Sequence, residues 1–205
     1  MNRAELKSTA KEQLRGRWGL AIITVLVSNL IINSYNMFKG VDFVIEISEN
    51  LTLTLNLISL IFGGVISTGL SKFLLNFTTN REVPKFADLF SQFKIFFKAL
   101  GLFILMGIAI ILGTLFFIIP GIIVALMFSQ AFYILAENPN KGIFECLEES
   151  SNLMHGYKWE LFVLQLSFIG WELLAVLTFG IASLWINPYQ KVTEANFYLK
   201  LKYNI

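Results

Sequence analysis

The sequence predicts an all-α fold, a polytopic transmembrane helix bundle with six spans, and two observations carry this prediction. First, 56% of the 205 residues are hydrophobic and 15% are charged, whereas about a quarter of the residues in soluble domains are charged. Second, the stretch from Ala99 to Ala136 contains no charge. As one helix it would be roughly 57 Å long, nearly twice the ~30 Å hydrocarbon core of a bilayer. It must therefore fold back.

The hairpin is expected to turn at Pro120 and Gly121, near the middle of this stretch. Proline lacks the N–H that an interior helical turn needs, and it drives the preceding residue out of the α region. It also suits the first position of a new helix. We therefore expect spans at about 100–118 and 120–136.

Four further spans complete one integral membrane domain over residues 1–205. Their expected ranges are about 18–37, 52–77, 160–179 and 181–200. The last range is interrupted by polar residues, and its Pro188 is expected either to break the helix at a binding site or, as we favour, to kink it around a neighbouring helix.

Charge decides whether this sixth span exists. With six spans and the N-terminus inside, every Lys and Arg except Lys39 is cytoplasmic, if Lys72 and Lys191 belong to the inner halves of their helices. The positive-inside rule therefore favours six spans with both termini cytoplasmic.

Three amphipathic helices are expected on the cytoplasmic side, at about 2–17, 84–98 and 141–154. The first is basic and fits either a helix on the anionic inner leaflet or a solvated signal that fixes topology. The second carries a phenylalanine stripe opposite residues such as Gln92, and fits an interfacial helix or a helix covering the mouth of the bundle. The apolar stripe of the third comprises Ile143, Phe144, Leu147, Ser151 and Met154.

A face of small side chains runs along the second span. Four of its members recur every fourth residue, namely Ser59, Gly63, Ser67 and Ser71. In lipid, where apolar burial does not drive helices together, such a face lets a neighbouring helix approach closely. We favour this helix-packing seam over the alternative of a substrate groove. Asn29 and Asn33, four residues apart in the first span, should likewise face the interior.

Glu172 is the most informative single residue. It lies about twelve residues into the fifth span, near the bilayer centre, where a charge costs at least about 2.5 kcal/mol. We hypothesise an ion pair with Lys191 on the antiparallel sixth span, within a polar seam that Gln165, Gln190 and Glu194 complete. This seam is either an ion, proton or substrate site or, as we favour, a buried pair that fixes helix register.

The sequence contains no motif for catalysis, cofactor binding or metal binding. Cys146 is the only cysteine and His155 the only histidine, so an intrachain disulfide and a Cys/His zinc cluster are excluded. Phosphate-binding glycine loops, the metalloprotease helix motif and the nucleophile elbow are absent. We expect Cys146 to be a small apolar filler and His155 to lie in a solvated turn. No enzyme activity, cofactor, metal or nucleic-acid partner is expected.

Several stretches, in this order and at these distances, resemble one family. They are ELKSTAKEQLRGRW, IPGI, YILAENP, ESSNLMHGYKWELFVLQLSFIGWELL and NPYQKVTEANFY. The chain resembles the domain-of-unknown-function 975 family of small multi-span membrane proteins of Gram-positive bacteria, most strongly from Ile119 onward. The resemblance implies a bacterial plasma membrane and a helical bundle, and it supplies no reaction, substrate or catalytic residue.

These observations favour a non-enzymatic plasma-membrane protein that acts through membrane lipids or protein partners, such as an accessory, envelope or immunity-type component. Its partner would be another membrane protein or a second copy of the chain. The small-residue face and the three amphipathic segments support this interpretation. The alternative is a small transporter with a polar intramembrane site around Glu172.

Overall fold

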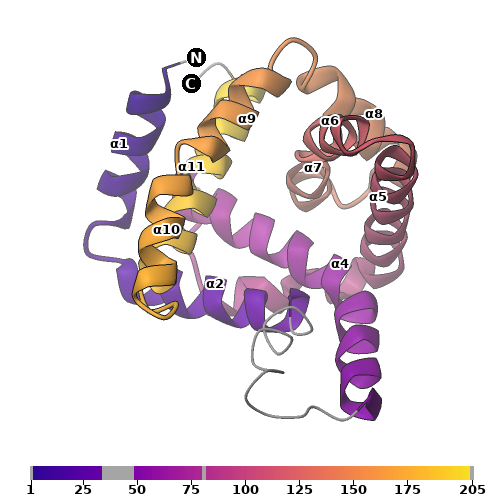
Figure 1. Ribbon diagram of the computed structural model, residues 1–205, viewed down its shortest axis with the longest axis horizontal. Helices are drawn as coiled ribbons and strands as arrows, with labels where there is room; N and C mark the ends of the chain where they lie inside the picture. The colour runs from indigo at the N-terminus through magenta and orange to yellow at the C-terminus, as the bar shows by residue number, and fades with distance from the viewer. Residues whose placement is uncertain (1, 34–48, 80–81, 204–205) are drawn as a thin grey trace.

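The computed structural model describes residues 2–33, 49–79 and 82–203, and every regular element in these ranges is helical. The all-α class is confirmed. In Figure 1, α1, α9, α10 and α11 lie on one side of the molecule, α5 to α8 lie on the other, and α2 and α4 connect them. The elements are α1 (Arg3–Leu14), α2 (Trp18–Ile32), α4 (Glu49–Thr79), the 3₁₀ helix η1 (Phe86–Ile95), α5 (Phe96–Phe116), α6 (Ile118–Phe128), α7 (Ala131–Glu137), α8 (Ile143–Leu153), α9 (Lys158–Leu166), α10 (Ile169–Leu177) and α11 (Ser183–Tyr203).

Four helical stretches are long and apolar enough to cross a membrane. They are Asn50–Thr79, Phe86–Phe116, Ile118–Glu137 and Lys158–Leu177. A fifth span arises if α1 and α2, which meet at a bend of 106°, are counted together.

These stretches coincide with four of the expected spans. In the span expected over 18–37, residues 34–37 lie outside the described residues. The range expected as the sixth span falls on α11, which is not among the stretches that qualify. Pro188 lies within α11 without ending it, which excludes the break, the alternative we favoured less. Four or five spans are therefore supported.

The apolar stretch folds into a hairpin, but the turn precedes the expected position. α5 ends at Phe116, and the extended Phe117 separates it from α6. Pro120 is the third residue of α6, where helical N–H groups have no intrahelical partner. A Cβ at Gly121 would overlap the side chain of Thr114 on α5. Proline thus fits the start of the second arm, and glycine lets the two arms approach closely.

The basic helix α1 packs onto the bundle. Its apolar residues Leu6, Ala10 and Leu14 are buried. Gln13 and Asn196 of α11 exchange side-chain hydrogen bonds, with the Gln13 amide donating at 3.2 Å and the Asn196 amide at 2.7 Å. The apolar face of this helix is therefore covered by protein.

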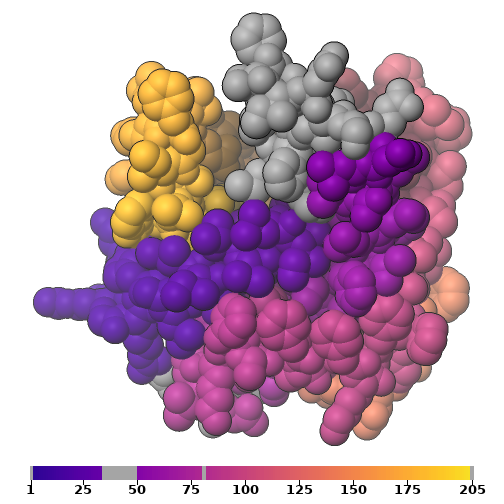
Figure 2. All heavy atoms as spheres, turned by 90° about the horizontal axis from the view of Figure 1, so that it is seen from below, coloured from indigo at the N-terminus to yellow at the C-terminus, as the bar shows by residue number. Residues whose placement is uncertain are grey.

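The phenylalanine stripe follows a 3₁₀ helix. Because residues three apart align in such a helix, Phe90, Phe93 and Phe96 form a ladder with ring centroids 6.3 and 6.4 Å apart. Leu89 and Gln92 form the next row and are buried. Gln92 thus lies away from the phenylalanine stripe, as expected, and it is the row with Gln92 that faces the bundle. On the face seen in Figure 2, η1 lies beside α2.

The third amphipathic helix, α8, presents a different face from the one expected. Cys146, Leu147, Ser150 and Met154 are buried, whereas Phe144 is exposed. The small Ser150 faces inward because its hydroxyl donates to the Met127 carbonyl at 2.8 Å. A hydrogen bond to the broken end of α6 thus decides the orientation of α8.

Lys202 near the end of α11 ties this helix to α7 and α8. Its ammonium lies 2.9 Å from Glu137 and 3.1 Å from Glu149. The Tyr198 hydroxyl donates to Glu137 at 2.7 Å, and its ring stacks on Tyr133 with centroids 5.1 Å apart. α11 is therefore held against the opposite side of the bundle along its last two turns.

Candidate functional site

A polar cavity of about 260 Å³ lies between α2, α4, α7 and α11. These helices surround the centre of the molecule in Figure 1. The polar side chains of its wall are Asn29, Asn33, Ser67, Ser71, Ser129, Tyr133, Lys191 and Glu194. Its apolar side chains are Ile32, Leu70, Leu74 and Phe132. The wall thus combines apolar side chains, hydrogen-bonding groups and one charge of each sign.

The cavity arises because several helices each contribute residues that share a face. Residues three or four apart lie on the same side of a helix, which brings Asn29 and Asn33 from the α2 segment together. The same spacing aligns Ser67 with Ser71 on α4. Two polar faces recognisable in the sequence therefore line a single cavity.

The small-residue face of α4 divides into a packing part and a cavity part. A Cβ at Gly63 would lie 2.9 Å from Phe103 of α5, so this position lets α5 approach closely. Ser59 donates a hydrogen bond to the Ile32 carbonyl of α2. Ser67 and Ser71 border the cavity instead. Ser59 and Gly63 thus fit the helix-packing interpretation of this face, whereas Ser67 and Ser71 fit the groove interpretation.

A break between α6 and α7 brings Ser129 and Tyr133 to the cavity. The backbone N–H of Gln130 donates to Ser150 of α8 at 3.2 Å, and the Gln130 side chain donates to the Ser129 hydroxyl at 2.8 Å. In the part of the chain that the structure describes, the buried Gln130 Oε1 atom accepts no hydrogen bond. The sequence signal for this break is the pair Ser129-Gln130 in an otherwise apolar stretch; Tyr133 has no comparable signal.

Lys191 and Glu194 form the charged centre of the wall. The Lys191 ammonium lies 2.9 Å from Glu194 Oε2. The other carboxylate oxygen, Oε1, accepts hydrogen bonds from Gln165 of α9 at 3.2 Å and from Gln190 at 3.4 Å. Four of the five residues of the expected polar seam therefore meet.

Glu172 does not join them. It lies exposed in the first turn of α10, a position where a negative charge interacts favourably with the helix dipole. Lys191 pairs with Glu194 on its own helix, three residues away. A pair within one helix forms whatever the position of the neighbouring helices. A pair between Glu172 and Lys191 would instead require α10 to turn Glu172 toward α11. Ser167 and Phe168 separate α9 from α10, and Glu172 lies beyond this break.

The remaining reactive side chains lie elsewhere. Cys146 is buried in α8, and burial raises the pKa of its thiol to about 11. His155 is exposed in the turn before α9. Across residues 2–33, 49–79 and 82–203, no group of three or more His, Cys, Asp or Glu side chains is placed to hold a metal ion. The cavity therefore offers its hydrogen-bonding groups and its ion pair for the binding of a polar molecule.

The fold and this cavity define an all-α protein whose apolar helices are consistent with an integral membrane protein and which holds a polar cavity between its helices. The model of the family described as "Protein of unknown function (DUF975)" matches residues 1–120 and 114–204, so the chain belongs to this family. The resemblance seen in the sequence is thereby confirmed. No curated protein and no solved structure matches the chain significantly.

Proposed function

We propose that the protein is a non-enzymatic membrane protein that binds a small polar solute inside its helix bundle, as a small transporter does. The cavity between α2, α4, α7 and α11 is the observation that carries this proposal. Ionisable groups among apolar helices are costly and face the bundle interior or a water-filled space where they serve a function. Substrate sites of transporters are built between helices in this way. The proposed site is centred on Lys191 and Glu194 in place of Glu172.

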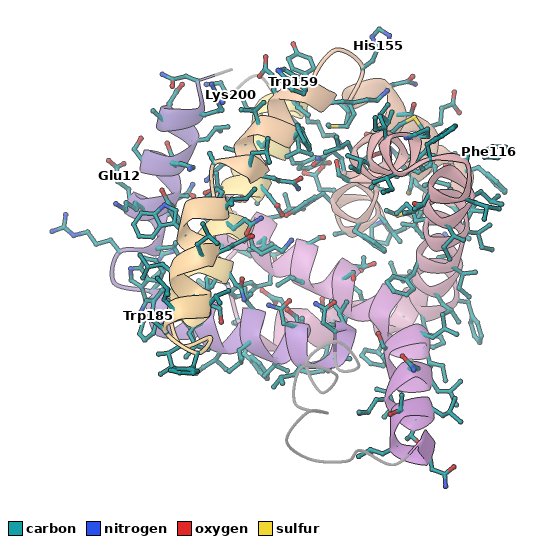
Figure 3. The ribbon with its side chains drawn as sticks, viewed as in Figure 1. Glu12, Phe116, His155, Trp159, Trp185 and Lys200 are labelled. Atoms are coloured by element: carbon teal, nitrogen blue, oxygen red, sulfur yellow. The ribbon has the colours of Figure 1, made fainter. Side chains whose placement is uncertain are left out.

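In this proposal α2 and α11 complete six spans in a bacterial plasma membrane, with both termini cytoplasmic. An ion pair of 2.9 Å between Lys200 of α11 and Glu5 of α1 supports a common side for the two terminal helices. Figure 3 shows Lys200 and Trp185 at opposite ends of α11. Reporters fused after Ile205 and before Met1 should both be active in the cytoplasm. If a reporter fused to either terminus is found outside the cell, this topology is wrong.

Native mass spectrometry of the protein released from lipid nanodiscs tests solute binding. A leucine at position 67 projects into the cavity, so the S67L variant should lose a solute that leaves the membrane with the wild-type protein. The matched control is T54L, on the exposed part of the same helix, which should keep the solute. Thermal unfolding of both variants checks that they are folded. Equal solute content in all three proteins contradicts the proposal.

A second candidate function is that of an accessory, envelope or immunity-type component acting through lipids or a membrane-protein partner. The exposed rings of η1 favour it, because Phe86, Phe90, Phe93 and the adjoining Phe97 are all exposed large apolar side chains. Such a stripe with lysines at its flanks suits a membrane interface. A protein partner or second copy released stoichiometrically in the same measurement supports this function, and a solute supports the first.

A further inference from the structure

We infer that the cavity binds a small zwitterion, whose ammonium group pairs with Glu194 and whose anionic group pairs with Lys191. This inference rests on the proposed function, because it names the ligand class of the same cavity. It follows from the arrangement of the two charges, from the hydrogen-bonding groups that remain unused, and from the size of the space.

The two charges of the wall differ in how firmly they are held. Glu194 is fixed by Gln165 and Gln190 at one oxygen and by Lys191 at the other. The Lys191 side chain is 38% exposed against 14% for that of Glu194, and it ends a flexible four-carbon stem. A ligand can therefore displace the ammonium of Lys191 while the carboxylate stays in place.

Charge balance selects a ligand that carries both signs. The pair is neutral as a whole, and an isolated charge added among apolar helices is strongly disfavoured. A zwitterion that inserts between Lys191 and Glu194 gives each of the four charged groups an opposite partner. A ligand with one charge leaves either the carboxylate or the ammonium without its counter-ion.

Unused donors face the space that such a ligand would fill. An ammonium has three N–H donors, and among the described residues Lys191 donates one hydrogen bond, to Glu194. The side-chain amides of Asn29 and Asn33 also line the cavity. These groups are available to the anionic end and to the body of the ligand.

The volume limits the ligand to a small molecule. About 260 Å³ holds roughly eight water molecules at ~30 Å³ each, and drug-sized ligands occupy pockets of about 300–1,000 Å³. A short amino acid or the phosphoethanolamine headgroup of a lipid satisfies both limits. Both present an ammonium and an anion separated by a short chain.

Binding to the wild-type protein in phosphatidylglycerol nanodiscs, measured by titration calorimetry, tests the inference. The probes are β-alanine and glycerophosphoethanolamine, which carry one positive and one negative charge, and butyrate and butylamine, which match β-alanine in length but carry one charge. Because a hydrogen bond to a charged group contributes about 1.5–3 kcal/mol, at least one zwitterion should bind about tenfold or more tightly than both single-charge probes.

Variants locate the site of this binding. K191M and E194Q should each weaken zwitterion binding at least about tenfold, whereas E172Q, a matched change on the exposed surface of α10, should leave it unchanged. If both charge variants fail to fold, S67L serves in their place and should also abolish binding. Unchanged zwitterion binding in the folded charge variants overturns the inference.

The outcomes separate this inference from the function on which it rests. If butyrate or butylamine binds as tightly as the zwitterions, and S67L loses this binding, the inference about the ligand class is wrong. The cavity is then still a solute-binding site. If no probe binds, and the wild-type protein releases no solute in mass spectrometry, both the zwitterion inference and the proposed solute-binding function are wrong. A preference for glycerophosphoethanolamine, with phosphatidylethanolamine retained when that lipid is supplied, identifies a lipid source. A preference for β-alanine identifies a free solute.

Discussion

The α5–α6 hairpin and α11 invert the pattern of a water-soluble protein. The hairpin has no charge beyond Lys98, yet the five residues 115–119 around its turn are 70–78% exposed. α11 carries Lys191 and Glu194, yet many of its side chains are buried. In water the apolar segment would be the interior one. The inversion is expected when lipid is the solvent, because lipid accepts apolar side chains and excludes charges.

Two phenylalanines give the largest test of this contrast. Phe197 of α11 is 1% exposed, and Phe116 at the hairpin turn is 76% exposed. F197A should lower the free energy of unfolding by about 3 kcal/mol, because the lost packing leaves a cavity. F116A should change it by less than about 0.5 kcal/mol. Unfolding of both variants in the same detergent measures the difference, and equal effects would contradict the assignment of α11 as the interior helix.

Lys202 gives the next largest effect. Its side chain is 16% exposed and that of its partner Glu137 is 8% exposed. K202M should destabilise the protein by about 2–3 kcal/mol, somewhat below the 3–5 kcal/mol typical of a fully buried pair that loses one partner. The control is K94M on the exposed side of η1, which should stay within about 0.5 kcal/mol of the wild type. Equal stability of the two variants would mean that this contact does not hold α11 in place.

The closeness of the hairpin arms predicts a smaller effect. G121A should cost about 1–2 kcal/mol, because its methyl group would overlap Thr114 and push the arms apart. Gly107, on the same arm as Thr114, has no atom near the position of an added Cβ. G107A should therefore stabilise the helix slightly, by up to about 1 kcal/mol. Thermal unfolding of the pair measures both changes, and a G121A variant as stable as G107A would show that the arms are not closely packed.

The sequence predicts most of the fold because apolarity and length are local properties. The uncharged stretch required a hairpin, and Pro120 with Gly121 located its turn to within four residues of Phe117. The face of α8 was predicted less well, since the inward position of Ser150 depends on a hydrogen bond to Met127. The separation of the phenylalanine stripe from Gln92 was predicted correctly, whereas the 3₁₀ period of η1 was not, because composition does not determine it.

Part of the candidate site could likewise be predicted from the sequence, and part depends on the packing of distant helices. Asn29 with Asn33 and Ser67 with Ser71 were predictable as faces, because helical spacing alone defines them. That these faces meet Lys191 in one cavity follows from packing between helices that are distant in sequence. Glu172 was the wrong partner for Lys191, because it lies exposed on α10, beyond a break that the apolar pattern did not indicate. The partner three residues away, Glu194, was available from spacing.

The smallest predicted effect concerns acid. Lys141 and Lys202 donate to Glu149 on α8 and lower the pKa of its carboxyl below the usual 4.5, although partial burial alone would raise it. The stability from this carboxylate is therefore complete above pH 4.5 and is lost as the pH falls through the lower pKa of the folded state. Because the group is partly exposed, the loss should be under about 1 kcal/mol.

Unfolding measured between pH 3 and 6 tests this prediction. The free energy of unfolding should fall less with acid in E149Q than in the wild type, and high salt should reduce the difference between the two proteins. The uncharged arms 99–128 of the hairpin have no carboxylate that can contribute to this slope, so an acid loss that is unchanged in E149Q would place its origin in other charged contacts of the bundle.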